Sequence, residues 1–213
     1  MKKYVLKNCW LVLVLVVSLN SFVLANEKEV SGHSSGHHSE EGVSPDTALS
    51  KLEEVYTGQK PYAIILSCSD SRVVPEYIFD AGLGEIFIIR TAGNVIDPIV
   101  LGSIEYAAAH LGAKLLIVMG HEKCGAVTAA VNHTNESINI TAMLNAIKPA
   151  VEAMEKAGEK DNMVEKTIVE NANVMVKRVT EESSIIAGLV KEGKFKIVSA
   201  KYFLKDGHVE FKK

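Results

Sequence analysis

In residues 61–72, PYAIILSCSDSR, an apolar run ends in a group of reactive side chains. A short apolar run bounded by polar residues is typical of a buried strand, here residues 61–67. A second run, residues 114–120, KLLIVMG, has the same character and leads into His121 and Cys124. Ligands of open parallel sheets gather at the carboxyl ends of the strands. The two groups of side chains are therefore predicted to converge at one edge of a sheet.

These side chains form a set of metal ligands. Cys68 and Cys124 supply two thiolates, His121 supplies an imidazole and Asp70 a carboxylate. This is the mixture that Zn²⁺ prefers. His121 and Cys124 are three residues apart at a strand-to-helix turn, and a helix N-terminus near Cys124 favours its thiolate. We expect one Zn²⁺ per chain, bound by Cys68, His121 and Cys124, with the fourth position open to water, as in catalytic zinc sites.

Asp70 and Arg72 follow the first strand two residues apart, and we expect them to pair, with Arg72 keeping Asp70 ionised. Two thiolates already neutralise the charge of Zn²⁺, so they acidify a bound water less than three imidazoles would. A hydrogen-bond acceptor must then help to orient the nucleophile. Asp70 is the candidate for that role.

Helical and extended patterns alternate along the rest of the chain. The sequence predicts helices at about 45–56, 98–111, 137–157, 161–180 and 182–191, a short helical segment at 74–79 and another helix beginning near 124–125; it predicts further strands at 85–89, 195–203 and 209–211, the last after a turn at 206–207. This order predicts an α/β fold with a mostly parallel central sheet of about four or five strands flanked by helices.

The first 25 residues have the pattern of a secretory signal peptide, with three early lysines, an apolar stretch at 10–17 and a small residue at Ala25. A membrane anchor is the alternative, but the apolar run is shorter than the ~20 residues of a spanning helix. We expect cleavage near Ala25 and a periplasmic or secreted product that has no membrane segment. Residues 26–44 are polar and contain His33, His37 and His38, which predicts a disordered leader before a domain at 45–213.

Removal of the first 25 residues leaves 20 basic and 26 acidic residues, which takes the net charge from −3 to −6. This charge argues against a nucleic-acid-binding protein, which needs a basic face. Of the three cysteines, Cys68 and Cys124 remain. In an oxidising compartment a disulfide between them is an alternative to a metal site. A disulfide alone explains neither His121 nor the Asp70 and Arg72 pair.

The sequence resembles the β-class carbonic anhydrases. The resemblance rests on CSDSR at 68–72, HEKCG at 121–125 and FIIRTAGN at 87–94, and it covers about residues 45–205. It implies the reversible hydration of carbon dioxide to bicarbonate and a proton, by attack of a zinc-bound hydroxide. In the family's open state Asp70 would accept a hydrogen bond from the zinc-bound water; in its closed state Asp70 would take the fourth metal position and release Arg72. The sequence leaves both states open.

The resemblance also implies a homodimer or homotetramer, with the pocket formed partly by the neighbouring subunit. It assigns carbon dioxide and bicarbonate binding to Gln59, Phe87, Ala92, Tyr106 and Gly125. Gln59 would orient the substrate, Phe87 and Tyr106 would line an apolar pocket with Ala92 in its wall, and Gly125 would allow close backbone approach. Without the resemblance Phe87 and Tyr106 would be core residues. The segment 49–59 is shorter than the corresponding segment of the family, which carries an arm that reaches across to the partner subunit. We therefore expect this arm to be reduced or missing here.

Two other functions fit the same motifs. A hydrolase for COS or CS2 would use the same ligands on the same scaffold. A non-catalytic zinc-binding protein would take metal through its His-rich leader, but storage needs neither Gln59 nor Asp70 and Arg72. Deletion of residues 26–44 separates the cases, since an enzyme keeps its turnover whereas a zinc buffer loses capacity.

Overall fold

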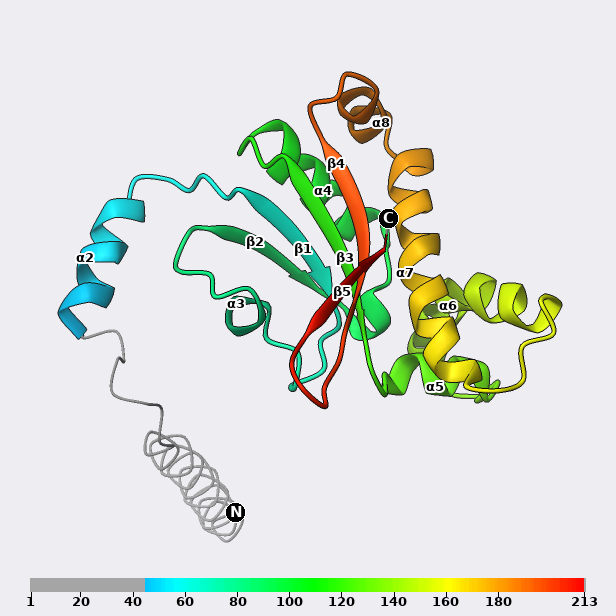
Figure 1. The fold of residues 1–213 in the computed structure, drawn as a ribbon. Coiled ribbons are helices and arrows are strands. Elements are labelled where there is room, and N and C mark those ends of the chain that lie inside the picture. The colour runs from blue at the N-terminus through cyan, green and yellow to red at the C-terminus, as the bar shows by residue number, and fades with distance from the viewer. Residues whose placement is uncertain (1–44, 213) are drawn as a thin grey trace, which may run out of the picture. The chain divides into compact units, whose positions relative to one another are not determined.

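The computed structural model describes residues 45–212. A five-stranded sheet forms its centre, with strand order β2-β1-β3-β4-β5 (Figure 1). The strands are β1 (Ala63–Ser67), β2 (Ile86–Arg90), β3 (Leu115–His121), β4 (Lys196–Tyr202) and β5 (Val209–Lys212). The first four are parallel and β5 is antiparallel to β4. The predicted mostly parallel sheet is confirmed, whereas the predicted signal peptide and leader at 1–25 and 26–44 lie outside the described residues.

One helix precedes β1, and the other helices lie in the connections between the strands. The helices are α2 (Pro45–Val55), α3 (Pro75–Ile78), the 3₁₀ turn η1 (Ala92–Asn94), α4 (Pro98–Ala109), α5 (Gly125–Val131), α6 (Ile138–Lys156), α7 (Met163–Glu182) and α8 (Ser184–Lys191). Within residues 45–212, none of these helices combines the length and apolar character that crossing a bilayer requires. The described residues from Leu49 onward form one compact unit.

Local sequence signals place the helix starts. Asp97 caps α4, where its carboxylate accepts the N–H groups of Ile99 and Val100 at 2.9 and 2.8 Å. Side-chain oxygens of Ser137 and Ser183 cap α6 and α8 in the same way. Such caps satisfy backbone donors that the first turn of a helix leaves unpaired.

The predicted strands agree with the structure to within about two residues, and two of them extend further than the sequence indicated. The strand β3 continues to His121, beyond the apolar run at 114–120, because it pairs with β4 as far as the register pair His121 and Tyr202. The second strand likewise continues to Arg90, which pairs with Ser67. Both extensions carry polar residues that lead into the site.

The core lies on both faces of the sheet, which explains why all five β1 residues are buried. On one face Ile64 and Leu66 pack against α4, α7 and α8. On the other face Ile65 packs with Val73 and with residues near α3. A third cluster joins Cys68 and Cys124 to apolar side chains of α5, α6 and α7, so the two thiols lie inside a packed layer.

Candidate metal centre

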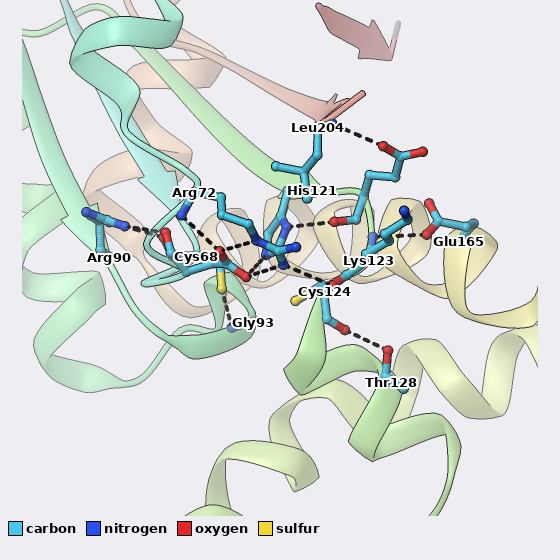
Figure 2. Close-up of polar contacts among 12 residues, drawn as sticks. Cys68, Arg72, Arg90, Gly93, His121, Lys123, Cys124, Thr128, Glu165 and Leu204 are labelled. Atoms are coloured by element: carbon cyan, nitrogen blue, oxygen red, sulfur yellow. Dashed lines mark hydrogen bonds and ion pairs between the residues drawn. The ribbon is translucent and has the colours of Figure 1, made fainter. Parts of the chain in front are cut away.

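Three buried ligands converge where β1 and β3 end. Cys68 follows β1, His121 is the last residue of β3 and Cys124 is the N-cap of α5. Their ligand atoms lie within 4.8 Å of one another (Figure 2). The residues are 5 %, 0 % and 1 % exposed, respectively. The predicted convergence of the two motifs is therefore what the structure shows.

The ring of His121 is oriented to present one nitrogen to this cluster. Nδ1 lies 2.9 Å from the Glu122 carbonyl oxygen. A carbonyl only accepts, so Nδ1 carries the proton and Nε2 has a free lone pair. Nε2 is buried and has no hydrogen-bond partner among residues 45–212. A bare, buried imidazole nitrogen is costly without a partner, and a metal ion would supply one.

The pKa values of the two thiols are shifted in opposite directions. The pKa of Cys68 is lowered, first by a hydrogen bond from the Cys124 thiol and also by the Gly93 N–H, which donates to Sγ at 3.3 Å. The pKa of Cys124 is raised by the same contact with Cys68 and by burial. A cation among them would hold both as thiolates, since coordination deprotonates a thiol outright. Two thiolates and one imidazole fit a divalent ion of borderline softness.

Asp70 and Arg72 form the predicted pair beside this cluster. Arg72 donates from Nε to Oδ1 at 2.9 Å and from Nη2 to Oδ2 at 2.7 Å. These hydrogen bonds are the main reason that the pKa of the Asp70 carboxyl is lowered. Oδ2 also lies 3.9 Å from Nε2 of His121. The carboxylate is thus ionised, held by Arg72 and next to the nitrogen that faces the ligand cluster.

Arg90 shapes the loop that carries Cys68 and Asp70, a role that the sequence did not reveal. Its Nε donates to the Cys68 carbonyl at 3.1 Å and its Nη2 to the Asp70 carbonyl at 2.7 Å. The signal was available in part, since Arg90 belongs to the quoted FIIRTAGN motif. The sequence could not show which groups Arg90 binds, because the two carbonyls follow the end of the neighbouring strand.

Gly93 and Asn171 form a chain of hydrogen bonds to the Cys68 sulfur. The Gly93 N–H donates to this sulfur, and Asn171 donates to the Gly93 carbonyl. Gly93 has a φ of 72°, and a Cβ there would lie 2.8 Å from Cδ1 of Ile147. The Asn171 side chain, 1 % exposed, donates from Nδ2 to the Gly93 carbonyl at 2.9 Å. Gly93 belongs to the quoted motif. Asn171 had no such signal, because its contact spans 78 residues of sequence.

Of the five residues assigned to substrate binding, two lie next to the metal ligands and three lie elsewhere in the chain. Ala92 in η1 and Gly125 at the start of α5 are direct neighbours of Gly93 and Cys124. Gln59 is exposed and precedes the amino end of β1, opposite the end that leads to Cys68. Phe87 lies in the edge strand β2, pairs with Ile64 and packs against the core. Tyr106 is 50 % exposed on α4. One chain alone thus brings Ala92 and Gly125 to the metal ligands and leaves Gln59 on the surface.

Comparison with known proteins agrees with this fold and this site. The family model described as carbonic anhydrase matches residues 63–209. The chain is 36 % identical over 172 residues to a carbonic anhydrase of Mycolicibacterium smegmatis, which covers 79 % of this chain and 82 % of that protein. The chain belongs to the carbonic anhydrase family, and its fold is that of the β class.

Two solved structures have a similar fold. The β-carbonic anhydrase CafA of Aspergillus fumigatus superposes with a TM-score of 0.69 at 26 % identity, covering 91 % of this chain and 90 % of that one. One of two tetrameric β-carbonic anhydrases from Sordaria macrospora gives a TM-score of 0.70 at 20 % identity, covering 91 % and 96 %.

Proposed function

We propose that this chain is a zinc-dependent carbonic anhydrase that interconverts carbon dioxide and water with bicarbonate and a proton. The observation that carries the proposal is the buried cluster of Cys68, His121 and Cys124, with Nε2 of His121 bare and an ionised Asp70 beside it. A zinc-storage site would need the first three residues but not a carboxylate fixed by Arg72.

The residues divide the work as follows. Sγ of Cys68, Nε2 of His121 and Sγ of Cys124 would hold one zinc ion per chain. When bound, zinc supplies the Lewis acidity that activates water near neutral pH. Asp70 accepts a hydrogen bond from the attacking water and so fixes its orientation. Arg72 holds Asp70 in position, and the two bonds between them favour this role over direct ligation of the metal by Asp70, since ligation requires Arg72 to let go.

The substrate pocket is completed by a second copy of the chain. Gln59 and Tyr106 lie on the surface of one chain, and α4 also exposes Ile99 at 80 %. An apolar exposed face next to residues assigned to the pocket supports a homodimer, or a homotetramer built from dimers. Mixing two inactive variants tests this. Gln59→Ala and Cys68→Ser chains, refolded together, should regain part of the activity, because one site of each mixed dimer receives both intact residues. No recovery in mixed dimers would contradict a shared pocket.

Export of the protein is part of the same proposal. Its support is the signal-peptide pattern of residues 1–25, with a periplasmic or secreted product after cleavage. Mass spectrometry of the protein recovered from the expressing cells tests it. A chain that begins near Asn26 is the expected product, and a chain that retains Met1 in the soluble cell interior would contradict export.

Stopped-flow hydration of carbon dioxide tests the activity. The zinc-loaded protein should turn over, and Cys68→Ser should not, while an exposed control such as Glu181→Gln should behave as wild type. Hydrolysis of COS and CS2 is measured alongside. Turnover of those gases without hydration of carbon dioxide would reassign the site to the sulfur substrates.

A further inference from the structure

The turn between His121 and Cys124 has a conformation that its sequence does not favour. Lys123 lies in this turn with a φ of 55°, in the left-handed region that glycine occupies readily and lysine does not. Both neighbours in the motif, His121 and Cys124, depend on this turn to point at one place. A strained residue at a functional site persists only where its surroundings impose it.

Charged groups on both sides impose the conformation of Lys123. Its N–H donates to Oε1 of Glu165 on α7 at 3.0 Å (Figure 2). Its carbonyl faces Nη2 of Arg72 at 3.5 Å. The Lys123 backbone thus lies between an anion on its donor side and a cation on its acceptor side. This arrangement joins the turn to the Asp70 and Arg72 pair.

Glu165 is itself fixed by a lysine from the sheet. Nζ of Lys201 lies 2.6 Å from Oε2 of Glu165. The Lys201 residue is only 8 % exposed, and its Nζ lies 4.7 Å from the centroid of the Phe203 ring. Register places Lys201 opposite Gly120, the residue before His121. The pair therefore bridges α7 and β4 directly beside the strand end that supplies two metal ligands.

Close packing at Gly120 makes this bridge possible. A Cβ on Gly120 would lie 2.9 Å from Cγ2 of Ile168 and 3.1 Å from its carbonyl oxygen. The helix α7 can therefore approach β3 closely at this residue. Glu165, almost one turn before Ile168, is brought to the turn as a consequence.

Burying a lysine almost completely costs desolvation free energy, which offsets much of what its ion pair contributes to stability. An apolar pair of similar volume is often as stable as a buried ion pair. The Glu165 and Lys201 pair does something that an apolar pair cannot, since Oε1 of Glu165 accepts the N–H of a strained residue between two metal ligands. Groups that hydrogen-bond to the residues carrying the metal ligands orient those ligands and set metal affinity.

We propose that Glu165 and Lys201 form a positioning pair that holds the His121–Cys124 turn in its metal-binding shape before the metal arrives. This inference rests on the proposed metal site. It gives Glu165 and Lys201 no contact with the substrate. Their effect is exerted through Lys123 on the directions of His121 and Cys124.

The test compares single and double substitutions by zinc affinity and by the visible spectrum of the cobalt-substituted protein. Glu165→Leu/Lys201→Met removes both charges and the acceptor for Lys123, and leaves no unpaired buried charge. Glu181→Gln is the matched control, because Glu181 is an exposed carboxylate on the same helix that pairs only at the surface with Lys177. Urea unfolding of the metal-free proteins shows that each variant is folded.

We expect the double variant to be folded, to bind zinc about 10–100-fold more weakly and to give altered cobalt bands. Lys201→Met, which leaves Glu165 as an acceptor, should lose less affinity. Wild-type zinc affinity and cobalt bands in the folded double variant would overturn the inference and leave the proposed enzyme intact. A wild-type protein that binds no zinc would overturn the proposed function and this inference together.

Discussion

Arg72 holds the Asp70 carboxylate by three hydrogen bonds, from Nε and the backbone N–H to Oδ1 at 2.9 and 3.0 Å, and from Nη2 to Oδ2 at 2.7 Å. Oδ2 is at the same time 3.9 Å from Nε2 of His121. The carboxylate therefore lies between a cation that retains it and a ligand cluster that would attract it once a metal is bound. In the proposed mechanism, the balance between the two would govern whether Asp70 serves the attacking water or displaces it.

Arg72→Met should shift this balance toward the metal. Loss of hydrogen bonds to a charged group is worth about 1.5–3 kcal/mol, which corresponds to about tenfold or more in the population of the released carboxylate. We expect hydration of carbon dioxide to fall at least about tenfold at neutral pH while zinc stays bound. The control is Arg178→Met, which breaks an exposed pair with Glu182 on α7. Equal activity in both variants would show that Arg72 does not restrain Asp70.

The Asp70 and Arg72 pair should also make stability depend on pH in one direction. The pKa of Asp70 is lowered in the folded state, first by the Arg72 side chain, so the pair stabilises the fold above the unfolded pKa of about 4. That contribution is lost progressively as the pH falls toward the folded pKa. Arg72 is half exposed, so about 1 kcal/mol or less is expected.

Urea unfolding of the metal-free protein at pH 7, 5 and 3 measures this effect. Wild type should exceed Asp70→Asn in free energy of unfolding at pH 7, and the difference should shrink at pH 3. A difference that grows as the pH falls has the wrong sign for a lowered pKa and would refute the assignment.

Gly93→Ala should destabilise the protein and disturb Cys68. A side chain at Gly93 meets Ile147 at 2.8 Å and Ala126 at 3.1 Å, and its φ of 72° is unfavourable for alanine. Strain of this kind costs about 1–3 kcal/mol. Gly188→Ala in α8 is the matched control, since a Cβ there has no atom within 4 Å and alanine favours a helix by about 1 kcal/mol. Thermal unfolding of the two variants should therefore shift in opposite directions, and a shift of both the same way would count against the close contact at Gly93.

Asn171→Ala should weaken both the fold and the metal site. Its amide donates to the Gly93 carbonyl, while the N–H of the same glycine donates to the Cys68 sulfur. Leaving a buried carbonyl unpaired costs about 1–3 kcal/mol. Calorimetric unfolding with and without zinc measures the loss, and Asn145→Ala on the exposed side of α6 is the control. If zinc raised the unfolding temperature of Asn171→Ala as much as that of wild type, Asn171 would support only the fold.

The sequence predicted those features that are encoded locally. The apolar runs at 61–67 and 114–120 predicted the two strands that carry the site. Because Cys68, His121 and Cys124 follow the ends of these runs, their convergence could also be predicted. Caps such as Asp97 marked helix starts. Each of these signals depends on neighbours within a few residues, so a single chain is enough to interpret it.

Long-range contacts of polar residues escaped prediction. Asn171 and Glu165 lie within a helix whose polar residues resemble an ordinary solvated face, yet one reaches Gly93 and the other reaches Lys123, 42 residues away. Only the packing of α7 against β3 at Gly120 reveals their targets. The substrate pocket is a further case, since Gln59 has no neighbour at the metal ligands within its own chain.

If the cluster of Cys68, His121 and Cys124 holds the zinc ion that the proposed reaction requires, turnover depends on bound metal. The most direct measurement is the rate of carbon dioxide hydration as the metal-free protein is titrated with zinc, with bound metal counted in the same samples. We expect no turnover without metal and a rate that rises linearly until one zinc is bound per chain. A full rate in the metal-free protein, or a bound zinc that brings no turnover, would contradict this expectation.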